Sequence, residues 1–472
     1  MSLSSSIAKN TFIHTLGKFS ASGIGLIIVA LITRYLGAEG FGYYTTIFSY
    51  LFFFATAGDL GLYLIAINEL GRSQEKDKET IYSHIFTLRF LSGIFFMIVA
   101  DSLIWFFPYN PAIKLGTLII SISVLTMMVD QVVVAIFQEQ MKTKFAAMAE
   151  FLGKILTLIL IYLAIKSNLS IIYLLWATTL GLIFHAFFNL FFARKFLHFN
   201  LSYHKETWLK ILKNSWPIAT YLIFSMIYFK ADTIILSLYH PQSTVGLYGA
   251  SYKILEVLIT LPVIFMGLVS PHLSRAWAEN NFSHFKAVYQ KAFDLLSTLV
   301  WPMIFSVLVL AKPIMAFIAG SEFLPAAPIF QILIIATGII FLAHLSTFSI
   351  VAINKQKTMM KFYIIAAIVA LILYFIFIPK YSYWAASLIT VAVESFILIC
   401  SWLMIKKETG IKINLDISAK SFLASLIMAI VISLTNLNLF ANIILAIITY
   451  FSCLWLFGVM KKEMISEFLK KE

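Results

Sequence analysis

The chain consists, almost from end to end, of hydrophobic blocks long enough to cross a membrane. A transmembrane helix needs about 20 mostly apolar residues, and fourteen such blocks can be marked along the 472 residues. They cover residues 12–33, 41–66, 85–107, 115–137, 145–165, 170–193, 216–239, 246–270, 292–311, 326–352, 362–379, 383–405, 421–437 and 440–460. The sequence therefore predicts an all-α integral membrane protein with about 14 transmembrane helices.

The composition agrees with this prediction and argues against a nucleic-acid partner. The mean hydropathy is +0.92, and 61% of the residues are apolar while only 12% are charged. The formal net charge is +13, but the Lys and Arg residues are scattered through short loops and do not form a basic soluble face. Cys400 and Cys453 both fall inside predicted spans, so neither a disulfide framework nor a metal cluster is expected.

The distribution of basic residues predicts the orientation of the chain. With the N-terminus in the cytoplasm, cytoplasmic segments hold 25 of the 35 Lys and Arg residues, outer loops hold five, and the spans hold five. Basic residues accumulate on the cytoplasmic side of membrane proteins. Both termini are therefore expected in the cytoplasm.

The organisation of the spans predicts two lobes and an additional helix pair. Residues 194–215 form the longest charged segment between spans, and their mixture of apolar and Lys residues suits a short helix at the inner membrane interface. We expect an N-terminal lobe of six helices, an interfacial linker, a C-terminal lobe of six helices, and a final pair with a cytoplasmic tail. These regions cover residues 1–200, 201–215, 216–405 and 406–472.

An internal repeat supports the two-lobe interpretation. When the chain is shifted by 204 residues against itself, Tyr35 meets Tyr239, Gly42 meets Gly246, and Tyr44 meets Tyr248, and Asn10 likewise meets Asn214. The aromatic and glycine matches lie at the outer hairpin between the first and second helix of each lobe. Because each lobe has six helices and starts on the same side, the two would be pseudo-symmetric about an axis along the membrane normal.

Polar residues at helical spacing mark the first two helices of each predicted lobe. A charge at the centre of a transmembrane helix costs about 2.5 to 3.5 kcal/mol on insertion scales, so these residues should face protein or a water-filled cavity. The stripes are His14, Lys18 and Ser22; Thr45, Ser49, Thr56 and Asp59; Tyr221, Ser225, Tyr228 and Asp232; and Tyr252, Glu256 and Thr260, with Lys253 alongside. They indicate either a cavity between the lobes or hydrogen bonds that join helices.

Other polar residues within the spans have simpler interpretations. Lys253 and Glu256 are three residues apart and can pair along one helix. Arg89 and Asp101 lie near opposite ends of the third span, so each is expected to reach the headgroup region. The pattern assigns no role to Asp130.

Three segments resemble a known family of transporters. Residues 31–44 read LITRYLGAEGFGYY, residues 59–62 read DLGL, and Val245, Gly246, Leu247 and Tyr248 are followed by Ala250, Tyr252 and Lys253. These motifs resemble those of bacterial polysaccharide and O-antigen flippases, which belong to the multidrug/oligosaccharidyl-lipid/polysaccharide exporter superfamily. The likeness covers nearly the whole chain in length, span number and loop pattern.

This resemblance implies a function and a central cavity between V-shaped lobes. It implies an undecaprenyl-pyrophosphate-linked oligosaccharide as substrate, moved across the bacterial plasma (inner) membrane by alternating access for O-antigen, capsule or exopolysaccharide synthesis. Substrate would bind the cationic residues, whereas the acidic ones would balance charge or couple H⁺ or Na⁺. The first set is Lys18, Arg34, Lys230, Lys253 and His14; the second is Asp59, Asp232 and Glu256. A polysaccharide polymerase and glycosyltransferases are expected partners.

Two other transporter functions remain open at this point, whereas an enzyme is not expected. A lipid II flippase also has fourteen helices and a cationic cavity, and a multidrug or cation antiporter belongs to the same superfamily. A membrane glycosyltransferase needs paired carboxylates or a base in a sizeable loop, but residues 312–325, the largest outer loop, carry only Lys312 and Glu322 as charges. The sequence lacks a phosphate-binding loop and a zinc-binding His-Glu-x-x-His motif, so no cofactor is expected.

Overall fold

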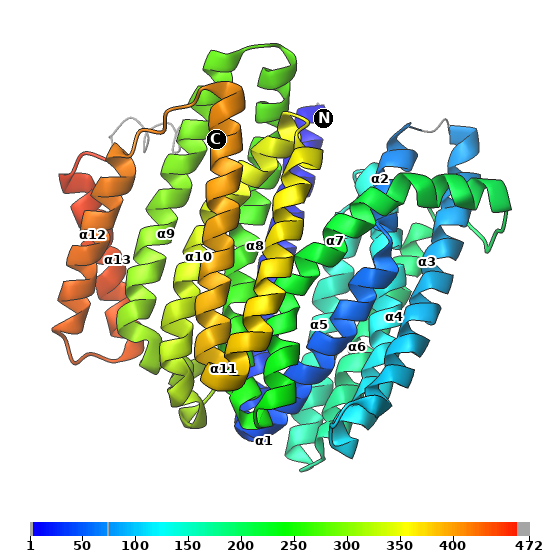
Figure 1. The fold of residues 1–472 in the computed structure, drawn as a ribbon, viewed down its shortest axis with the longest axis horizontal. Coiled ribbons are helices and arrows are strands. Elements are labelled where there is room, and N and C mark those ends of the chain that lie inside the picture. The colour runs from blue at the N-terminus through cyan, green and yellow to red at the C-terminus, as the bar shows by residue number, and fades with distance from the viewer. Residues whose placement is uncertain (1–2, 73–74, 460–472) are drawn as a thin grey trace. The chain divides into compact units, whose positions relative to one another are not determined.

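The computed structural model describes residues 3–72 and 75–459, and the secondary structure in this part of the chain is helical throughout (Figure 1). The helices are α1 (Leu3–Asp59), α2 (Leu62–Arg72), α3 (Glu75–Leu103), η1 (Ile104–Phe106), α4 (Pro111–Glu139), α5 (Lys144–Lys166), α6 (Ile171–Ala193), α7 (Lys205–Tyr239), α8 (Gln242–Ala278), α9 (Phe282–Ile318), η2 (Ser321–Ala326), α10 (Ala327–Ala352), α11 (Gln356–Thr409), α12 (Asp416–Ser433) and α13 (Leu439–Leu456). The prediction of an all-α membrane protein is confirmed.

Twelve candidate membrane spans within the described residues account for the fourteen predicted crossings. Ser20–Asp59 has 40 residues and Gln356–Thr409 has 54, which at 1.5 Å per residue is about 60 Å and 80 Å, twice or more the hydrocarbon thickness. Each contains a non-helical residue that divides it into two arms, Gly37 with φ 66° and Ser382 with φ 55°. Both fall between predicted spans.

Short polar residues begin several of the helices. The Asn110 side chain accepts a hydrogen bond from the amide of Ile113 at the start of α4, where Pro111 occupies the first turn. Asn438 accepts from Ala441 in the same way at the start of α13. These side chains satisfy amides that have no partner within the helix, so the loops can be short and the spans can start abruptly.

The chain divides by its internal contacts into two compact units. Unit 1 contains residues 1–250 together with 371–383, and unit 2 contains residues 251–370 together with 384–472. Unit 1 therefore includes α1 to α7 and the first turns of α8. Unit 2 includes the remainder of α8, then α9, α10, most of α11, α12 and α13.

In unit 1, α6 packs against both α4 and α5, and α1 packs against α4, α5 and α7. At one end, α2, α3 and α4 share a hydrophobic cluster that also contains Ile211 from the beginning of α7. Lys210 and Lys213 on either side of Ile211 are exposed. The linker helix that the sequence predicts is therefore amphipathic and continuous with α7, and Figure 1 shows its first turns running across the bundle before α7 turns along it.

The two predicted repeats touch through a reciprocal contact within unit 1, which we call the hairpin contact and define by Ala38, Gly42, Gln242 and Gly246. A Cβ atom added to Gly42 would lie 1.8 Å from the carbonyl oxygen of Gln242, and one added to Gly246 would lie 1.8 Å from that of Ala38. Ala38 and Gln242 are themselves related by the offset of 204 residues. The contact is thus pseudo-two-fold, because equivalent atoms of each repeat meet the other.

In unit 2, α9 is flanked by α10 and α12, and α13 packs mainly on α12. Tyr450 on α13 donates a hydrogen bond to the carbonyl oxygen of Thr298 at 2.6 Å, and the indole of Trp301 donates to the Ser418 hydroxyl at 3.0 Å. A small apolar cluster fills the space between α9, α12 and α13. The two C-terminal helices are therefore an appended pair attached to α9, as the sequence predicts.

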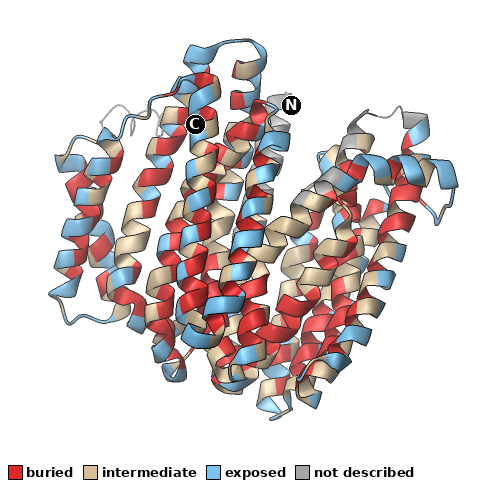
Figure 2. Cartoon of the chain, in the orientation of Figure 1, coloured by how far each residue is buried: buried red, intermediate tan, exposed pale blue. Residues whose placement is uncertain are grey.

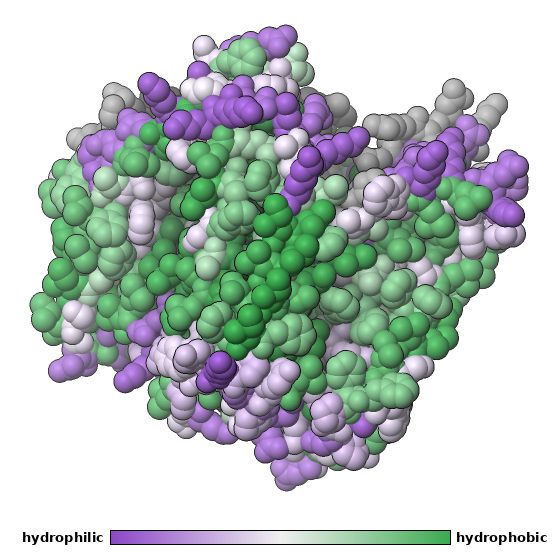
Figure 3. Space-filling view, viewed as in Figure 1, coloured by the Kyte–Doolittle hydropathy of each residue, from purple (hydrophilic) through white to green (hydrophobic). Residues whose placement is uncertain are grey.

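The surface has the character of a protein that lies in lipid. Helices such as α3 and α12 alternate buried with exposed positions (Figure 2), and many of the exposed positions are large and apolar, among them Phe95, Ile98 and Ile430. Hydrophobic side chains cover the middle of the helices while hydrophilic ones gather towards their ends (Figure 3). Such an apolar band matches the hydrocarbon of a bilayer. Helices also suit this environment because their backbone hydrogen bonds are made within each helix. The chain is a multi-pass membrane protein.

Candidate functional site: a polar pocket in unit 1

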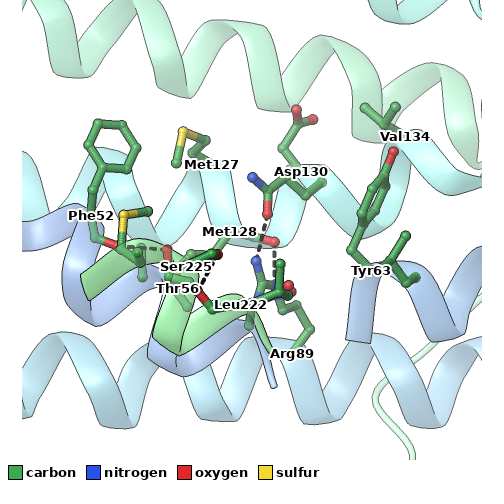
Figure 4. Close-up of a pocket in the computed structure, with 15 residues that line it drawn as sticks. Phe52, Thr56, Tyr63, Arg89, Met127, Met128, Asp130, Val134, Leu222 and Ser225 are labelled. Carbon is green, nitrogen blue, oxygen red and sulfur yellow. Dashed lines mark hydrogen bonds and ion pairs between the residues drawn. The ribbon is translucent and has the colours of Figure 1, made fainter. Parts of the chain in front are cut away.

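A pocket of about 640 Å³ lies inside unit 1, with a few polar side chains set in a largely apolar wall, and we call it the polar pocket. Five helices form its walls: the second arm of α1, then α2, α3, α4 and α7. The lining residues are Phe52, Ala55, Thr56, Asp59, Tyr63, Leu64, Arg89, Met127, Met128, Asp130, Gln131, Val134, Leu222, Ser225 and Met226 (Figure 4). Charged and amide groups inside membrane-spanning helices are costly, so they mark a candidate site for polar ligands or water.

The position of Asp59 follows from a tight turn that ends α1. Leu60 and Gly61 both have positive φ, 50° and 72°, which breaks the helix directly after Asp59 and lets α2 begin at Leu62. Ser92 on α3 donates a hydrogen bond at 2.8 Å to the carbonyl oxygen of Gly58 at this helix end. The DLGL motif therefore fixes a carboxylate at the end of a transmembrane arm, facing α3.

Arg89 of α3 connects three helices around this carboxylate. Its Nη1 lies 2.6 Å from Oδ1 of Asp59, an ion pair whose angle does not suit a hydrogen bond. Its Nε donates to the carbonyl oxygen of Met128, and its Nη2 donates to Oε1 of Gln131, both at 2.7 Å. The Arg89 side chain is only 1% exposed. The interpretation that Arg89 reaches the headgroups is wrong, because the guanidinium is instead bound inside the protein.

Asp130 on α4 belongs to a second buried group behind the pocket wall. Its Oδ1 accepts a hydrogen bond from Nδ2 of Asn189 on α6 at 2.9 Å, and its Oδ2 lies 3.6 Å from Nε2 of His185. Asp130 also lines the pocket. It thus joins the pocket to α6, although the sequence pattern assigned it no role.

The remaining polar atoms of the pocket are hydroxyl groups. Thr56 and Ser225 donate to carbonyl oxygens in their own helices, at 3.0 Å and 2.8 Å respectively, so their oxygen lone pairs remain acceptors for a ligand. The hydroxyl of Tyr63 exchanges hydrogen bonds with the Gln138 amide. These hydroxyl groups can therefore bind water or a hydroxyl-rich molecule, while Asp59 and Arg89 neutralise each other.

The structure brings together only part of the predicted site. Asp59 lines the pocket, as do Thr56 and Ser225 from two of the predicted stripes, whereas the lining contains none of the predicted cations. Lys18 and Arg34 are exposed on α1, and Lys230 is half-buried on α7 with its ammonium 5.2 Å from the centre of the Phe229 ring. The other predicted cation on α1, His14, lies with its side chain outside the described residues.

Two other predicted residues have well-defined partners. Lys253 in unit 2 forms an ion pair with Glu256 at 2.7 Å, which confirms that they pair along the helix. Asp232 in unit 1 is fully buried and accepts hydrogen bonds from the Tyr248 hydroxyl and from the amide of Thr233. Asp232 is therefore held between α7 and the start of α8, away from the pocket lining.

Sequence reasoning missed the importance of Arg89, Gln131 and Asp130. For Asp130 the signal was present, because an ionisable residue well inside a span marks a functional site by default; Arg89 lies near the end of its predicted span, where a long side chain can instead reach the headgroups. Gln131 adjoins Asp130 in the sequence, but only the packing of α3 against α4 shows that it receives the guanidinium. Within the described ranges, no three His, Cys, Asp or Glu residues gather as metal ligands.

Comparison with known proteins gives matches along most of the chain. The family model described as polysaccharide biosynthesis protein matches residues 7–277, and a second model, MatE, matches residues 217–376. A protein of Shigella dysenteriae assigned as an O-antigen transporter is 23% identical over 252 residues, which is 53% of this chain and 62% of the relative. The match thus spans less than two thirds of that curated relative.

Solved structures share the fold. A lipid II flippase, MurJ, in an inward closed conformation superposes with a TM-score of 0.80 and 18% identity, covering 94% of this chain and 98% of MurJ. A multidrug resistance MATE family transporter of the MOP superfamily, in an inward-facing conformation, gives a TM-score of 0.69 and 13% identity over 85% of this chain and 98% of its own. These relatives and neighbours are transporters and flippases, not enzymes.

Proposed function

Because the chain belongs to the family of polysaccharide biosynthesis proteins, we propose that it is a flippase for a lipid-linked oligosaccharide. The substrate is an oligosaccharide repeat unit on undecaprenyl pyrophosphate, which moves from the cytoplasmic to the outer leaflet of the bacterial plasma membrane. The export supplies the synthesis of O-antigen, capsule or exopolysaccharide. The match of the family model over more than half of the chain carries this proposal.

The polar pocket supports the proposal on chemical grounds. An oligosaccharide crossing a bilayer exposes many hydroxyl groups, and each unsatisfied polar group in hydrocarbon costs several kcal/mol. The pocket in unit 1 offers carboxylate, amide and hydroxyl oxygens along membrane-spanning helices. A wet passage lined by such groups removes most of the penalty.

The hairpin contact supports an alternating-access mechanism. Gly42 and Gly246 allow the two hairpins of unit 1 to approach until backbone touches backbone. Asp59 lies 16 residues of helix beyond Tyr43, which is about 24 Å along the arm. With the N-terminus in the cytoplasm, the contact closes the outer end while the pocket lies towards the inner end. Separation of the hairpins would then release the substrate outward.

We assign the cations to the diphosphate and acidic sugars. Lys18, Lys230 and Lys253, with Arg34 near the outer mouth, attract the anionic substrate, and Lys is suited to a phosphate that must later be released because it binds as a point charge. At Lys253 the substrate competes with Glu256. The prenyl tail stays in lipid or beside α12 and α13. Asp59 balances Arg89, and Asp232 or Glu256 couples transport to a proton or Na⁺.

The test is export by variants that lack two cations. We expect that replacing both Lys18 and Lys230 by Ala abolishes surface polysaccharide in a strain that depends on this chain, while the amount of protein in the membrane is unchanged. The matched control replaces Lys142 and Lys166, both exposed, and should export normally. Normal export by the first double variant would refute the assignment of the cations.

Lipids that co-purify with the protein test the substrate class. Mass spectrometry should find polyprenyl diphosphates that carry a sugar repeat unit. Masses that include a peptide-bearing disaccharide would identify lipid II as the substrate instead. Drug binding without any polyprenyl diphosphate would identify an exporter and contradict the proposal.

A further inference from the structure

A second polar pocket, of about 500 Å³, lies in unit 1 beside the hairpin contact. It is formed by the start of the second arm of α1, the loop that precedes α4, and the turn between α7 and α8. The lining residues are Glu39, Tyr43, Pro108, Tyr109, Asn110, Ile113, Ser237, Leu238, Tyr239, His240, Pro241, Gln242 and Ser243. None of these residues lines the first pocket, so the two are separate sites at opposite ends of the α1 arm.

Hydrogen bonds hold most of the polar groups of this pocket in place. Tyr109 and Ser237 share a hydrogen bond at 2.6 Å, and the Tyr43 hydroxyl donates to Oε1 of Glu39. Nε2 of His240 lies 2.8 Å from the carbonyl oxygen of Ile378. Since these contacts already fix the side chains, a ligand meets a preformed surface and loses little binding energy to ordering it.

The pocket combines aromatic rings with neutral donors and acceptors. Tyr43, Tyr109 and Tyr239 contribute aromatic side chains to the lining, a residue type whose ring suits the apolar side of a sugar and whose hydroxyl suits its polar edge. Burial raises the pKa of Tyr109 to about 12, even though the hydrogen bond with Ser237 opposes the shift. The Tyr109 hydroxyl therefore keeps its proton at physiological pH.

The charge of the lining selects among ligands. Glu39 is the one Asp, Glu, Lys or Arg among the lining residues, so a phosphate or an acidic sugar would be repelled. A carboxylate has two oxygens that accept hydrogen bonds, and only Oε1 receives the Tyr43 hydroxyl. The second oxygen can accept from the vicinal hydroxyl groups of a neutral sugar. We propose that this pocket is a binding site for the neutral sugar rings of an oligosaccharide, on the outer face of the protein.

The location gives such a site a role in release, which rests on the proposed function. Glu39 and Tyr43 belong to the first hairpin, whereas His240, Gln242 and Ser243 belong to the second. Gln242 also contributes to the hairpin contact and accepts a hydrogen bond from Thr46 at 2.7 Å. A sugar bound here touches both hairpins, so its binding favours one arrangement of the outer end over the other.

The test is direct binding of a neutral disaccharide to the purified full-length protein in nanodiscs. We expect saturable binding of N,N′-diacetylchitobiose in saturation-transfer NMR titrations, and a much weaker signal for a disaccharide that carries a uronic acid. Glu39→Gln should weaken binding of the neutral sugar about tenfold, because hydrogen bonds to a charged acceptor are roughly twice as strong as neutral ones. Tyr239→Phe should also weaken it.

The control and the contrary outcomes are well separated. Tyr173→Phe removes the hydroxyl of an exposed tyrosine outside the pocket and should bind as the unaltered chain does. Tyr239 is exposed as well, so its Phe variant remains informative if Glu39→Gln folds poorly. Absence of saturable sugar binding, or equal sugar binding by all variants, would overturn the proposed site. If the protein instead binds ethidium, and Glu39→Gln abolishes that binding, the pocket is a cation site. Sugar binding without export leaves the site intact and refutes the flippase.

Discussion

Replacing Gly42 by Ala should disfavour the close approach of the two hairpins of unit 1. The added Cβ would lie 1.8 Å from the carbonyl oxygen of Gln242 and 2.6 Å from its carbonyl carbon. Carbon and oxygen atoms in proteins approach to about 3.3 Å, so the backbones must separate by about 1.5 Å. Both atoms belong to backbone, and no side chain can rotate away to relieve the clash.

In the proposed alternating-access mechanism, the cost falls only on the arrangement in which the two hairpins touch. Overpacking a well-packed contact costs about 1 to 3 kcal/mol, and a bias of that size shifts a two-state equilibrium by roughly 5-fold to 150-fold. Gly246→Ala should act in the same way because its Cβ would meet the carbonyl oxygen of Ala38 at 1.8 Å. The double variant should exceed either single one but fall short of their sum, since neighbouring substitutions are not additive.

Spin labels on the two hairpins measure the effect. The labels are attached at Glu39→Cys and Ser243→Cys, after Cys400 and Cys453 have been replaced by Ser. Pulsed electron paramagnetic resonance should then show a population with a longer distance between the labels, and this population should be at least fivefold larger in Gly42→Ala. The control is Gly25→Ala in the same helix, where an added Cβ meets nothing within 4 Å. Identical distance distributions in the two variants would refute the role of the glycine contact.

Three further substitutions test how the fold is held, each by thermal unfolding of the purified protein. Arg89→Leu should lower the stability by about 3 to 5 kcal/mol because it leaves the Asp59 carboxylate buried without its cation, and adding Asp59→Asn should restore most of the loss; an equal loss in both would contradict the ion-pair argument. Tyr450→Phe should cost about 1 kcal/mol by removing the hydrogen bond to Thr298. Ser382→Gly should stabilise by about 1 kcal/mol because φ is 55° at this reversal, and a destabilised variant would show that the serine is needed there.

The positions of the membrane spans could be predicted because they depend on local composition. Each span needs a run of apolar residues, and each reversal needs a residue that leaves helical geometry, so Gly37 and Ser382 fall within the short gaps between predicted spans. The internal repeat could also be predicted from the sequence. Each hairpin needs a glycine where its backbone touches the other hairpin, and these two glycines are separated by the repeat offset of 204 residues. The pairing of Lys253 with Glu256 followed from helical spacing alone.

The polar pocket could be predicted only in part because its charges are paired across helices. Asp59 and Arg89 are 30 residues apart in the sequence, and nothing in the spacing says that α3 turns its guanidinium towards the end of α1. From its position in the sequence, Arg89 is expected near a membrane interface, where a long side chain can reach water. Tertiary packing supplied a better partner, and with it the contacts to Met128 and Gln131.

The two repeats share the geometry of their contact but not the chemistry of the pocket. Extending the offset of 204 residues along the same helices pairs Thr56 with Thr260, but it pairs Asp59 with Val263. A residue that allows the two hairpins to touch must be present in both repeats, because each hairpin packs against the other. A carboxylate that neutralises a buried guanidinium is needed only where that guanidinium lies. The hairpin contact is therefore a property of the pair of repeats, whereas the ion pair, and any selectivity that it gives, belongs to the N-terminal repeat.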